Sequence, residues 1–186
     1  LVDCGKLSIN FPVKIVKEGL AKIAIPDPSL YTNGKRVEPA WAPVFYNPRA
    51  ELSRDLSVCF LAVYLKGTDK EVILAEPLSA TGVRGIRYVI EVNNIKKVFL
   101  NDIDKKAFKL IQYNVKLNKI EDKVEVGNED ASLFLLRKKF EGEIFDVIDL
   151  DPYGSSVPFL DAALKALRRR GVLGLTFTDT AVAQGV

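Results

Sequence analysis

Short apolar runs alternate with amphipathic stretches over most of this chain. That alternation is typical of a parallel β-sheet whose two faces are covered by helices. Strands are expected at residues 72–75, 97–100, 123–126, 145–150 and 171–177. Helices are expected at residues 49–66, 82–92, 104–117, 132–138 and 157–167. The predicted fold class is therefore α/β, and ligands of such sheets bind beyond the carboxyl ends of the strands.

The N-terminal part of the chain shows a different pattern. Two β-rich runs, Ser8–Lys17 and Ala21–Ile25, flank the pair Glu18-Gly19 and predict a small β-hairpin. Prolines then punctuate a long loop. We therefore expect an N-terminal unit at residues 1–48 and a main domain at residues 49–186. The loop carries aromatic residues that could line a site or pin the loop to the core: Tyr31, Trp41, Phe45 and Tyr46.

The helix expected after Arg49 has apolar residues at intervals of three and four, which predicts a buried face. These residues are Leu52, Leu56, Cys59, Phe60 and Val63. Cys59 is accordingly expected to be buried, and it forms no zinc-binding spacing with Cys4. The chain has no histidine, which excludes Ser-His-Asp hydrolysis and histidine-ligated zinc. No metal site is predicted, and unpaired thiols fit a reducing compartment.

Charge and hydropathy bear on the partners and the location of the protein. The formal net charge of +3 is weak evidence for a polyanionic partner, because nucleic-acid-binding domains are usually more basic. No apolar run reaches the ~18 residues of a membrane span, and the first residues do not resemble a signal peptide. We therefore expect a cytoplasmic protein without a membrane partner. Because the chain lacks methionine, we also expect a piece of a longer protein or an altered sequence.

Small residues crowd the turn that follows the first strand of the predicted sheet. Ser79, Ala80, Gly82 and Gly85 would let a ligand approach the backbone closely, at the start of a helix. The same composition also fits a tight connection that binds nothing. A phosphate-binding Walker loop is excluded, because no Gly-Lys-Ser/Thr follows. Gly-x-Gly-x-x-Gly is absent too, which argues against a nicotinamide-binding dehydrogenase.

Acidic residues follow the next two strands. Asp102 lies where a carboxylate could accept hydrogen bonds from both hydroxyls of a ribose. Asp104 fits better as the N-cap of the following helix. After the third strand, Asp130 could accept from an adenine amino group while the Ala131 backbone N–H meets a ring nitrogen. Asp130 also fits as a helix N-cap, and both interpretations stay open.

The end of the fourth strand carries the most specific pattern. Asp149 and Asp151 fall on one face of the strand, and a carboxylate inside a buried strand requires a partner. Asp151, Pro152 and Tyr153 then form a rigid corner with a carboxylate and an aromatic ring that could stack on a base. We predict that these three residues are catalytic.

In this order, the motifs resemble those of the tRNA (guanine-26, N2)-dimethyltransferase family of archaea and eukaryotes. The resemblance covers roughly residues 20–185. The matching runs are Phe45-Tyr46-Asn47-Pro48-Arg49, Ser53-Arg54-Asp55, Leu78-Ser79-Ala80-Thr81-Gly82-Val83-Arg84-Gly85-Ile86-Arg87, Asn101-Asp102-Ile103, Asp130-Ala131, Asp149-Leu150-Asp151-Pro152-Tyr153-Gly154-Ser155 and Thr178-Asp179.

The resemblance implies a Rossmann-like sheet that binds S-adenosylmethionine and a tRNA partner. It implies transfer of the methyl group to the exocyclic N2 amine of guanine-26, with catalysis by Asp151 and help from Tyr153. Donor binding is expected from the residues that the family motifs match, Arg54, Arg84, Asp102, Asp130 and Ala131, and from the turn residues Ser79 and Gly82.

The chain also departs from the family pattern. The family usually has aspartate at the position of Glu76, and it often has asparagine at the position of Ser53. The resemblance ends with the chain, so we expect a sheet truncated after its fifth strand and a missing C-terminal domain. The alternatives are another nucleobase-amine methyltransferase, acting on adenine N6 of DNA or ribosomal RNA, and a non-catalytic donor-binding fragment.

Overall fold

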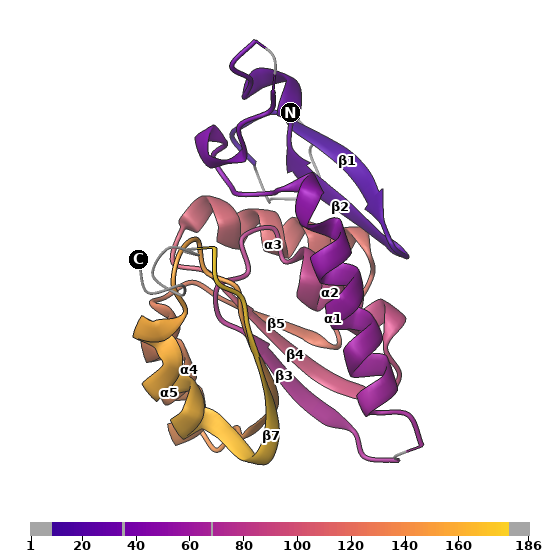
Figure 1. Ribbon diagram of the computed structural model, residues 1–186, viewed down its shortest axis with the longest axis vertical. Coiled ribbons are helices and arrows are strands. Elements are labelled where there is room, and N and C mark those ends of the chain that lie inside the picture. The colour runs from indigo at the N-terminus through magenta and orange to yellow at the C-terminus, as the bar shows by residue number, and fades with distance from the viewer. Residues whose placement is uncertain (1–8, 35, 68, 179–186) are drawn as a thin grey trace.

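The computed structural model describes residues 9–34, 36–67 and 69–178, and its centre is a five-stranded parallel sheet (Figure 1). The strand order is β5-β4-β3-β6-β7, so the order reverses between β3 and β6. The strands are β3 (Val72–Glu76), β4 (Ile95–Asn101), β5 (Val124–Gly127), β6 (Phe145–Leu150) and β7 (Leu167–Leu175). The predicted Rossmann-like α/β sheet is confirmed.

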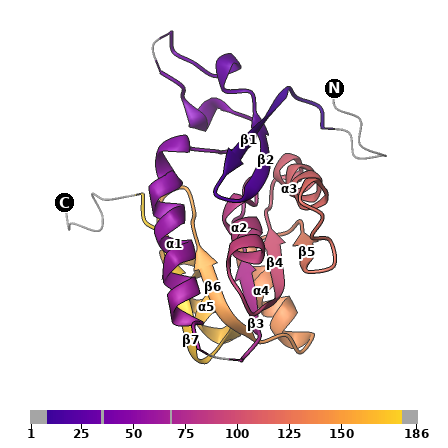
Figure 2. The same cartoon turned by 90° about the vertical axis from the view of Figure 1, so that its right-hand side faces the viewer.

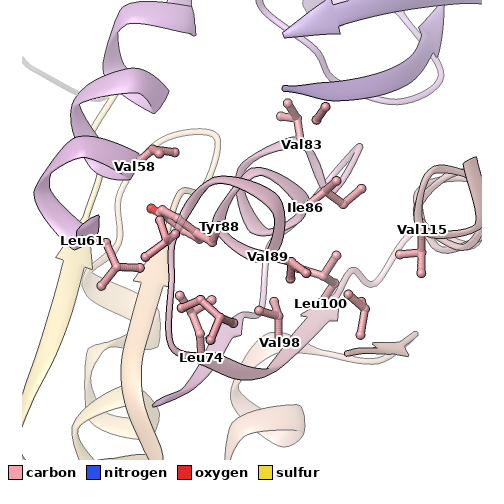
Figure 3. Packing of buried hydrophobic residues seen from close by; sticks show 14 of the residues in the cluster. Val58, Leu61, Leu74, Val83, Ile86, Tyr88, Val89, Val98, Leu100 and Val115 are labelled. Carbon is pink, nitrogen blue, oxygen red and sulfur yellow. The ribbon is translucent and has the colours of Figure 1, made fainter. Parts of the chain in front are cut away.

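Helices cover both faces of the sheet (Figures 1 and 2). The helices are α1 (Glu51–Tyr64), α2 (Val83–Glu91), α3 (Lys105–Leu117), α4 (Ala131–Phe140) and α5 (Leu160–Ala166). On one face, α1 to α3 bury Leu61, Ile86 and Val115 against Leu74 and Leu100 of the sheet (Figure 3). On the other, α4 and α5 pack over a second cluster: Phe99, Phe134, Phe145, Ile148 and Ala163. Burial on both faces explains why β3 and β6 are almost continuously apolar.

The predicted hairpin is present as antiparallel strands β1 (Val13–Glu18) and β2 (Ala21–Pro26). Ser8 lies outside the described residues, and residues 9–12 are not a strand. The turn requires glycine, because Gly19 has a φ of +55° and a Cβ there would lie 2.2 Å from Glu91 Oε1. Three short 3₁₀ helices follow in the proline-rich loop: η1 (Pro28–Leu30), η2 (Pro39–Trp41) and η3 (Pro48–Ala50).

Two asparagines, Asn114 of α3 and Asn118 directly after its last residue, attach the hairpin to the sheet domain. The Asn114 amide accepts from the Ala24 N–H at 2.7 Å and donates to the Ala24 carbonyl at 3.0 Å. One helical turn later, Asn118 makes the same pair of bonds to Lys22, at 2.9 and 2.7 Å. These amides satisfy backbone groups of β2 that the two-stranded hairpin leaves unpaired. These bonds hold β2 of the hairpin against α3.

The buried face predicted for α1 was wrong. Leu52, Leu56, Phe60 and Val63 are 57–72% exposed, and Cys59 is also exposed. The helix instead buries Arg54, Val58 and Leu61. Arg54 is held on that side by polar partners, and of the apolar residues Leu56 and Phe60 line a groove of about 430 Å³ between α1 and β7. Spacing identified the helix, but it could not show that a buried arginine sets its orientation.

The last helix and strand differ from the expected boundaries. The segment expected as one helix at residues 157–167 contains the 3₁₀ turn η4 (Val157–Phe159) and then α5. Strand β7 begins at Leu167 rather than at residue 171, and its register against β6 shifts between Phe145 and Val147. Arg170 has a φ of +65° there, a bulge-like conformation that the three arginines in sequence did not reveal. None of the helices in the described segments is long and apolar enough to cross a membrane.

Candidate active site

Two adjoining clefts lie at the carboxyl ends of β3, β4 and β6. The inner cleft, of about 120 Å³, is lined by the buried side chains of Arg54, Glu76 and Arg84. The outer cleft, of about 480 Å³, is lined by Asp102 and Phe159. Six residues line both clefts: Phe45, Leu78, Ala80, Asp151, Pro152 and Tyr153. Residues predicted to bind the donor and residues predicted to be catalytic therefore share the same walls.

The turn between β3 and α2 is held by its own contacts. Gly82 has a φ of +74°, and a Cβ there would lie 3.2 Å from Leu100 Cδ1, so glycine is needed where α2 begins. The Ser79 hydroxyl donates to the Glu76 carbonyl at 2.5 Å and accepts from the Asn101 N–H at 3.2 Å. These contacts account for Ser79 and Gly82 structurally, and their contact with a donor stays a prediction.

Asp102 is half-buried just beyond β4, in the wall of the outer cleft. Its carboxylate accepts from the Ala80 N–H at 2.8 Å and from the Asp104 N–H at 2.9 Å. Ala80 has a φ of +48°, which is uncommon outside glycine, so the turn is shaped around this carboxylate. Burial raises the pKa of Asp102, and the two N–H donors oppose that rise. Asp104 caps α3 through the Lys106 N–H at 2.7 Å, as predicted.

Asp130 and Ala131 are placed away from these clefts. The Asp130 carboxylate caps α4 by accepting from the Ser132 and Leu133 N–H groups at 2.9 and 3.0 Å. Neither Asp130 nor Ala131 lines the inner or the outer cleft. The preceding Asn128 ties this segment to the site, because its amide donates to the Asp102 carbonyl at 2.7 Å. The capping interpretation of Asp130 is confirmed, and its adenine contact stays a prediction.

The segment after β6 forms the acid and aromatic corner. Pro152 is buried, whereas the Asp151 side chain is 32% exposed and that of Tyr153 extends into solvent. The Tyr153 ring meets Phe45 edge-on, with 5.7 Å between ring centroids and 66° between planes. Phe45 belongs to the proline-rich loop, so that loop supplies a wall of the site. Two aromatic rings and one carboxylate thus converge on the same hollow.

Arg84 links this corner to the interior. Its Nη2 lies 2.6 Å from Asp151 Oδ2, and its Nη1 donates to the Ser57 hydroxyl at 2.8 Å. Nη1 also lies 3.5 Å from Oδ2 of Asp149, the buried acid for which the sequence required a partner. Within the described residues, the buried Nε of Arg84 has no hydrogen-bond partner. A buried charged donor left unpaired is costly, so this atom suits an acceptor supplied by a ligand.

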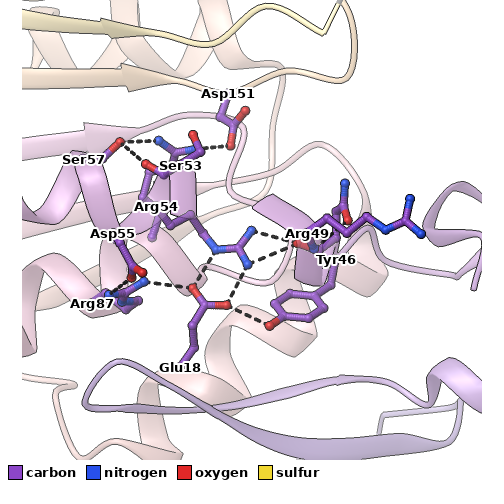
Figure 4. A network of polar contacts seen from close by, with 12 residues as sticks. Glu18, Tyr46, Arg49, Ser53, Arg54, Asp55, Ser57, Arg87 and Asp151 are labelled. Carbon is purple, nitrogen blue, oxygen red and sulfur yellow. Dashed lines mark hydrogen bonds and ion pairs between the residues drawn. The ribbon is translucent and has the colours of Figure 1, made fainter. Parts of the chain in front are cut away.

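Arg54 occupies a fully paired cluster beside the inner cleft (Figure 4). Its Nε and Nη2 donate to the two carboxylate oxygens of Glu18 at 2.6 and 2.7 Å, and Nη1 and Nη2 reach the Asn47 carbonyl at 3.2 Å. Tyr46 and Arg87 also bind Glu18, at 2.8 and 3.1 Å. Donor binding by Arg54 stays a prediction, and here its guanidinium joins the hairpin to α1.

Glu76 ends β3 inside the inner cleft and is only 3% exposed. Burial and the neighbouring Asp149 carboxylate raise its pKa well above the ordinary range. One Glu76 oxygen accepts from the Gly85 N–H at 3.0 Å. A neutral carboxyl group at this position can both donate and accept hydrogen bonds.

The sequence did not predict that Glu18 and Tyr88 belong to the charged clusters around the site. Glu18 resembles an ordinary hairpin residue, and nothing local shows that it meets two arginines. Tyr88 follows Arg84 by one helical turn and therefore lies on the same face of α2, a spacing that could have indicated contact. Its hydroxyl donates to Asp149 at 2.6 Å.

Comparison with known proteins decides the family. The family model described as N2,N2-dimethylguanosine tRNA methyltransferase (TRM) matches residues 19–186. This chain belongs to the TRM family. A tRNA (guanine(26)-N(2))-dimethyltransferase of Pyrobaculum islandicum is 47% identical over 169 residues, which are 91% of this chain and 44% of the relative. The tRNA (guanine(26)-N(2)/guanine(27)-N(2))-dimethyltransferase of Aquifex aeolicus is 42% identical, over 93% of this chain and 42% of the relative.

A solved structure of Trm1 agrees with the TRM assignment, and a more distant one shares only the fold. Trm1 of Pyrococcus horikoshii, in complex with S-adenosyl-L-methionine, superposes with a TM-score of 0.70 and 36% identity. The match covers 86% of this chain and 41% of the Trm1 chain. A tRNA m1G37 methyltransferase of Methanocaldococcus jannaschii shares the fold, with a TM-score of 0.64 and 20% identity. The chain spans less than half the length of the TRM relatives from Pyrobaculum islandicum, Aquifex aeolicus and Pyrococcus horikoshii.

Proposed function

We propose that the full-length protein transfers methyl groups from S-adenosylmethionine to the N2 amine of guanine-26 in tRNA. One observation carries this proposal: the ion pair of 2.6 Å between Arg84 and Asp151 lies where the inner and outer clefts meet. This arrangement supports the proposal, because a cation that could bind the donor would lie beside an acceptor that could bind the base. The names of the TRM relatives supply the substrate.

The residues at the clefts fit S-adenosylmethionine. The unpaired Nε of Arg84 suits the donor's carboxylate, and the half-buried Asp102 suits the ribose hydroxyls. The outer cleft, of about 480 Å³, falls within the range of small-molecule sites. When bound, S-adenosylmethionine would supply a methyl group made electrophilic by its sulfonium. Further proposed donor contacts are Arg54, Asp130, Ala131, Ser79 and Gly82.

The corner residues would activate the guanine amine. The lone pair of that amine is delocalised into the ring, which makes it a weak nucleophile. Asp151, and with it the Pro152 carbonyl, would accept hydrogen bonds from the amine and so favour attack by its nitrogen on the methyl carbon. S-adenosylhomocysteine would be the leaving group of this transfer. Asp151 would accept the proton that the positively charged, methylated amine releases, and would pass it on to water.

The aromatic rings would hold the base. A guanine inside a tRNA must leave its stack to reach Asp151, and an aromatic side chain can replace the lost stacking. Tyr153 is 80% exposed and Phe45 is 39% exposed, so both rings are accessible to a base. Their edge-on contact leaves the face of at least one ring free to stack.

Methylation by the full-length protein tests the function. We expect transfer of labelled methyl groups to a tRNA with guanine at position 26 and loss of transfer when adenine replaces it. The products, separated as nucleosides, should be N2-methylated guanosines. Equal labelling of both tRNAs, or labelling of adenine N6, would reject the proposal in favour of a different base target.

Calorimetry separates donor binding from catalysis. We expect S-adenosylhomocysteine to bind and NAD not to bind. Asp102→Ala should weaken S-adenosylhomocysteine roughly 10- to 100-fold, the effect of losing hydrogen bonds to a charged group. The exposed Asp122→Ala is the matched control and should bind like the wild type. Unchanged affinity in Asp102→Ala would remove Asp102 from the ribose site.

A further inference from the structure

Asp149 is a buried carboxylate that the proposed chemistry does not use. It lies inside β6, is 4% exposed, and does not line the inner or the outer cleft. Yet its Oδ2 accepts from the Tyr88 hydroxyl at 2.6 Å and lies 3.5 Å from Arg84 Nη1. A buried charge without a function would be costly and could be replaced by an apolar residue.

The Arg84 guanidinium lies between two carboxylates. Nη1 is turned toward Asp149 and Nη2 toward Asp151, so the single positive charge serves both acids. The two acids differ in their surroundings, since the side chain of Asp149 is 6% exposed and that of Asp151 is 32% exposed. Because Arg84 also compensates the negative charge of Asp149, it neutralises the charge of Asp151 less completely than it would in an isolated ion pair.

We propose that Tyr88 and Asp149 are positioning residues: they hold Arg84 and draw part of its charge from Asp151, which keeps Asp151 a strong acceptor for the guanine amine. This inference rests on the proposed function. Loss of the Asp149 charge would leave Arg84 paired with Asp151 alone. Asp151 would then be a weaker hydrogen-bond acceptor and a weaker base.

The groups around Asp149 set its charge. Helix α2 contributes Arg84 and Tyr88, β3 contributes Glu76, and Asp151 follows directly after the end of β6. From β7 the facing residue is Gly174, which has no titratable group. Burial raises the pKa of Asp149, Arg84 and the Tyr88 hydroxyl lower it, and Asp151 raises it. Removal of the Tyr88 hydroxyl should therefore raise the pKa of Asp149 further.

Two variants of the full-length protein test the inference through the pH dependence of kcat at saturating donor and tRNA. Tyr88→Phe should move the acidic limb to higher pH by about one unit, because a hydrogen bond to a charged group corresponds to roughly 1–2 pH units. Asp149→Asn should lower kcat roughly tenfold, also where the wild type has reached its plateau. Tyr113→Phe alters a buried tyrosine of α3 outside these contacts and should retain the wild-type profile.

Carbon-13 NMR of protein labelled at the aspartate carboxyl carbons gives a readout without turnover. The Asp149 signal, identified by its loss in Asp149→Asn, should titrate at higher pH in Tyr88→Phe than in the wild type. If Asp149→Asn does not fold, Tyr88→Phe still decides: an unchanged acidic limb in a folded, active variant overturns the inference. A wild type that methylates no guanine rejects the proposed function instead, while an unshifted Asp149 titration rejects the inference separately.

Discussion

Two buried arginine–carboxylate clusters lie side by side in this protein, and they differ in how completely their donors are paired. In the first, Arg54 has a partner for each nitrogen of its guanidinium, and Glu18 receives bonds from Arg54, Arg87 and Tyr46. In the second, Arg84 is shared between Asp149 and Asp151 and keeps one buried nitrogen unpaired. The first cluster joins the hairpin to α1 and α2, whereas the second opens into the clefts.

The difference separates a structural role from a functional one. In a fully paired cluster every donor already has a protein partner, so a ligand would have to replace one of these partners, and breaking the cluster leaves buried charge unpaired. An incompletely paired cluster keeps a cation and an acceptor available, at a cost in stability that a bound ligand can offset. Mutation should therefore affect mainly stability in the first cluster and mainly activity in the second.

The largest effect on activity is expected from Asp151→Ala. Loss of the acceptor for the guanine amine should reduce kcat about 10²- to 10⁴-fold, the range for a positioned acid–base group. Donor affinity should change little, because the unpaired nitrogen of Arg84 remains. Single-turnover methylation and calorimetry with S-adenosylhomocysteine measure the two quantities. Turnover near that of the wild type would remove Asp151 from catalysis.

The largest effect on stability is expected from Glu18→Ala. It leaves Arg54 and Arg87 buried without their shared carboxylate, and removal of one partner from a buried ion pair costs about 3–5 kcal/mol. Urea unfolding measures this loss. Glu121→Ala, at an exposed position, is the control and should lie within about 0.5 kcal/mol of the wild type. A small loss in Glu18→Ala would mean that the cluster does not hold the hairpin.

A smaller effect with a defined sign is expected from Glu76→Gln. A carboxyl group whose pKa is raised in the folded state binds its proton more tightly there than in the unfolded chain. The free energy of unfolding of the wild type should therefore fall as pH rises above the ordinary glutamate value of 4.5. Glutamine at position 76 cannot ionise, so the free energy of unfolding of the variant should not fall in this way. The difference in free energy of unfolding, variant minus wild type, should therefore increase from acidic to neutral pH. Parallel pH profiles in urea unfolding would contradict the assignment.

The smallest effect is expected from Arg137→Ala. Arg137 of α4 pairs with Glu129, which precedes the helix, and with Glu141, which follows it, but the Arg137 side chain is 43% exposed. Ion pairs in solvent contribute about 0–1 kcal/mol, so the unfolding midpoint should hardly move. A loss as large as that of Glu18→Ala would show that pairing alone, without burial, explains the first cluster.

The parallel sheet and much of the site could be predicted from the sequence. The apolar runs of β3 and β6 require burial on both faces, and the residues after such strands must meet at one edge of the sheet. That reasoning placed Asp102 and Asp151 correctly beside the clefts. It also recognised that Asp104 caps a helix, because capping is a local interaction between neighbouring residues.

Only the tertiary structure decided which charges meet. Glu18 and Arg54 are separated by 36 positions and Tyr88 and Asp149 by 61, so no local pattern relates them. The same limit explains the error in α1, where hydrophobic spacing defines a helix but a buried arginine sets its orientation. Hydrophobic periodicity and helix capping depend on residues that are close in sequence, so both can be predicted from the sequence alone. The pairing of buried charges depends on the packing of distant elements, and it exists only once the chain has folded.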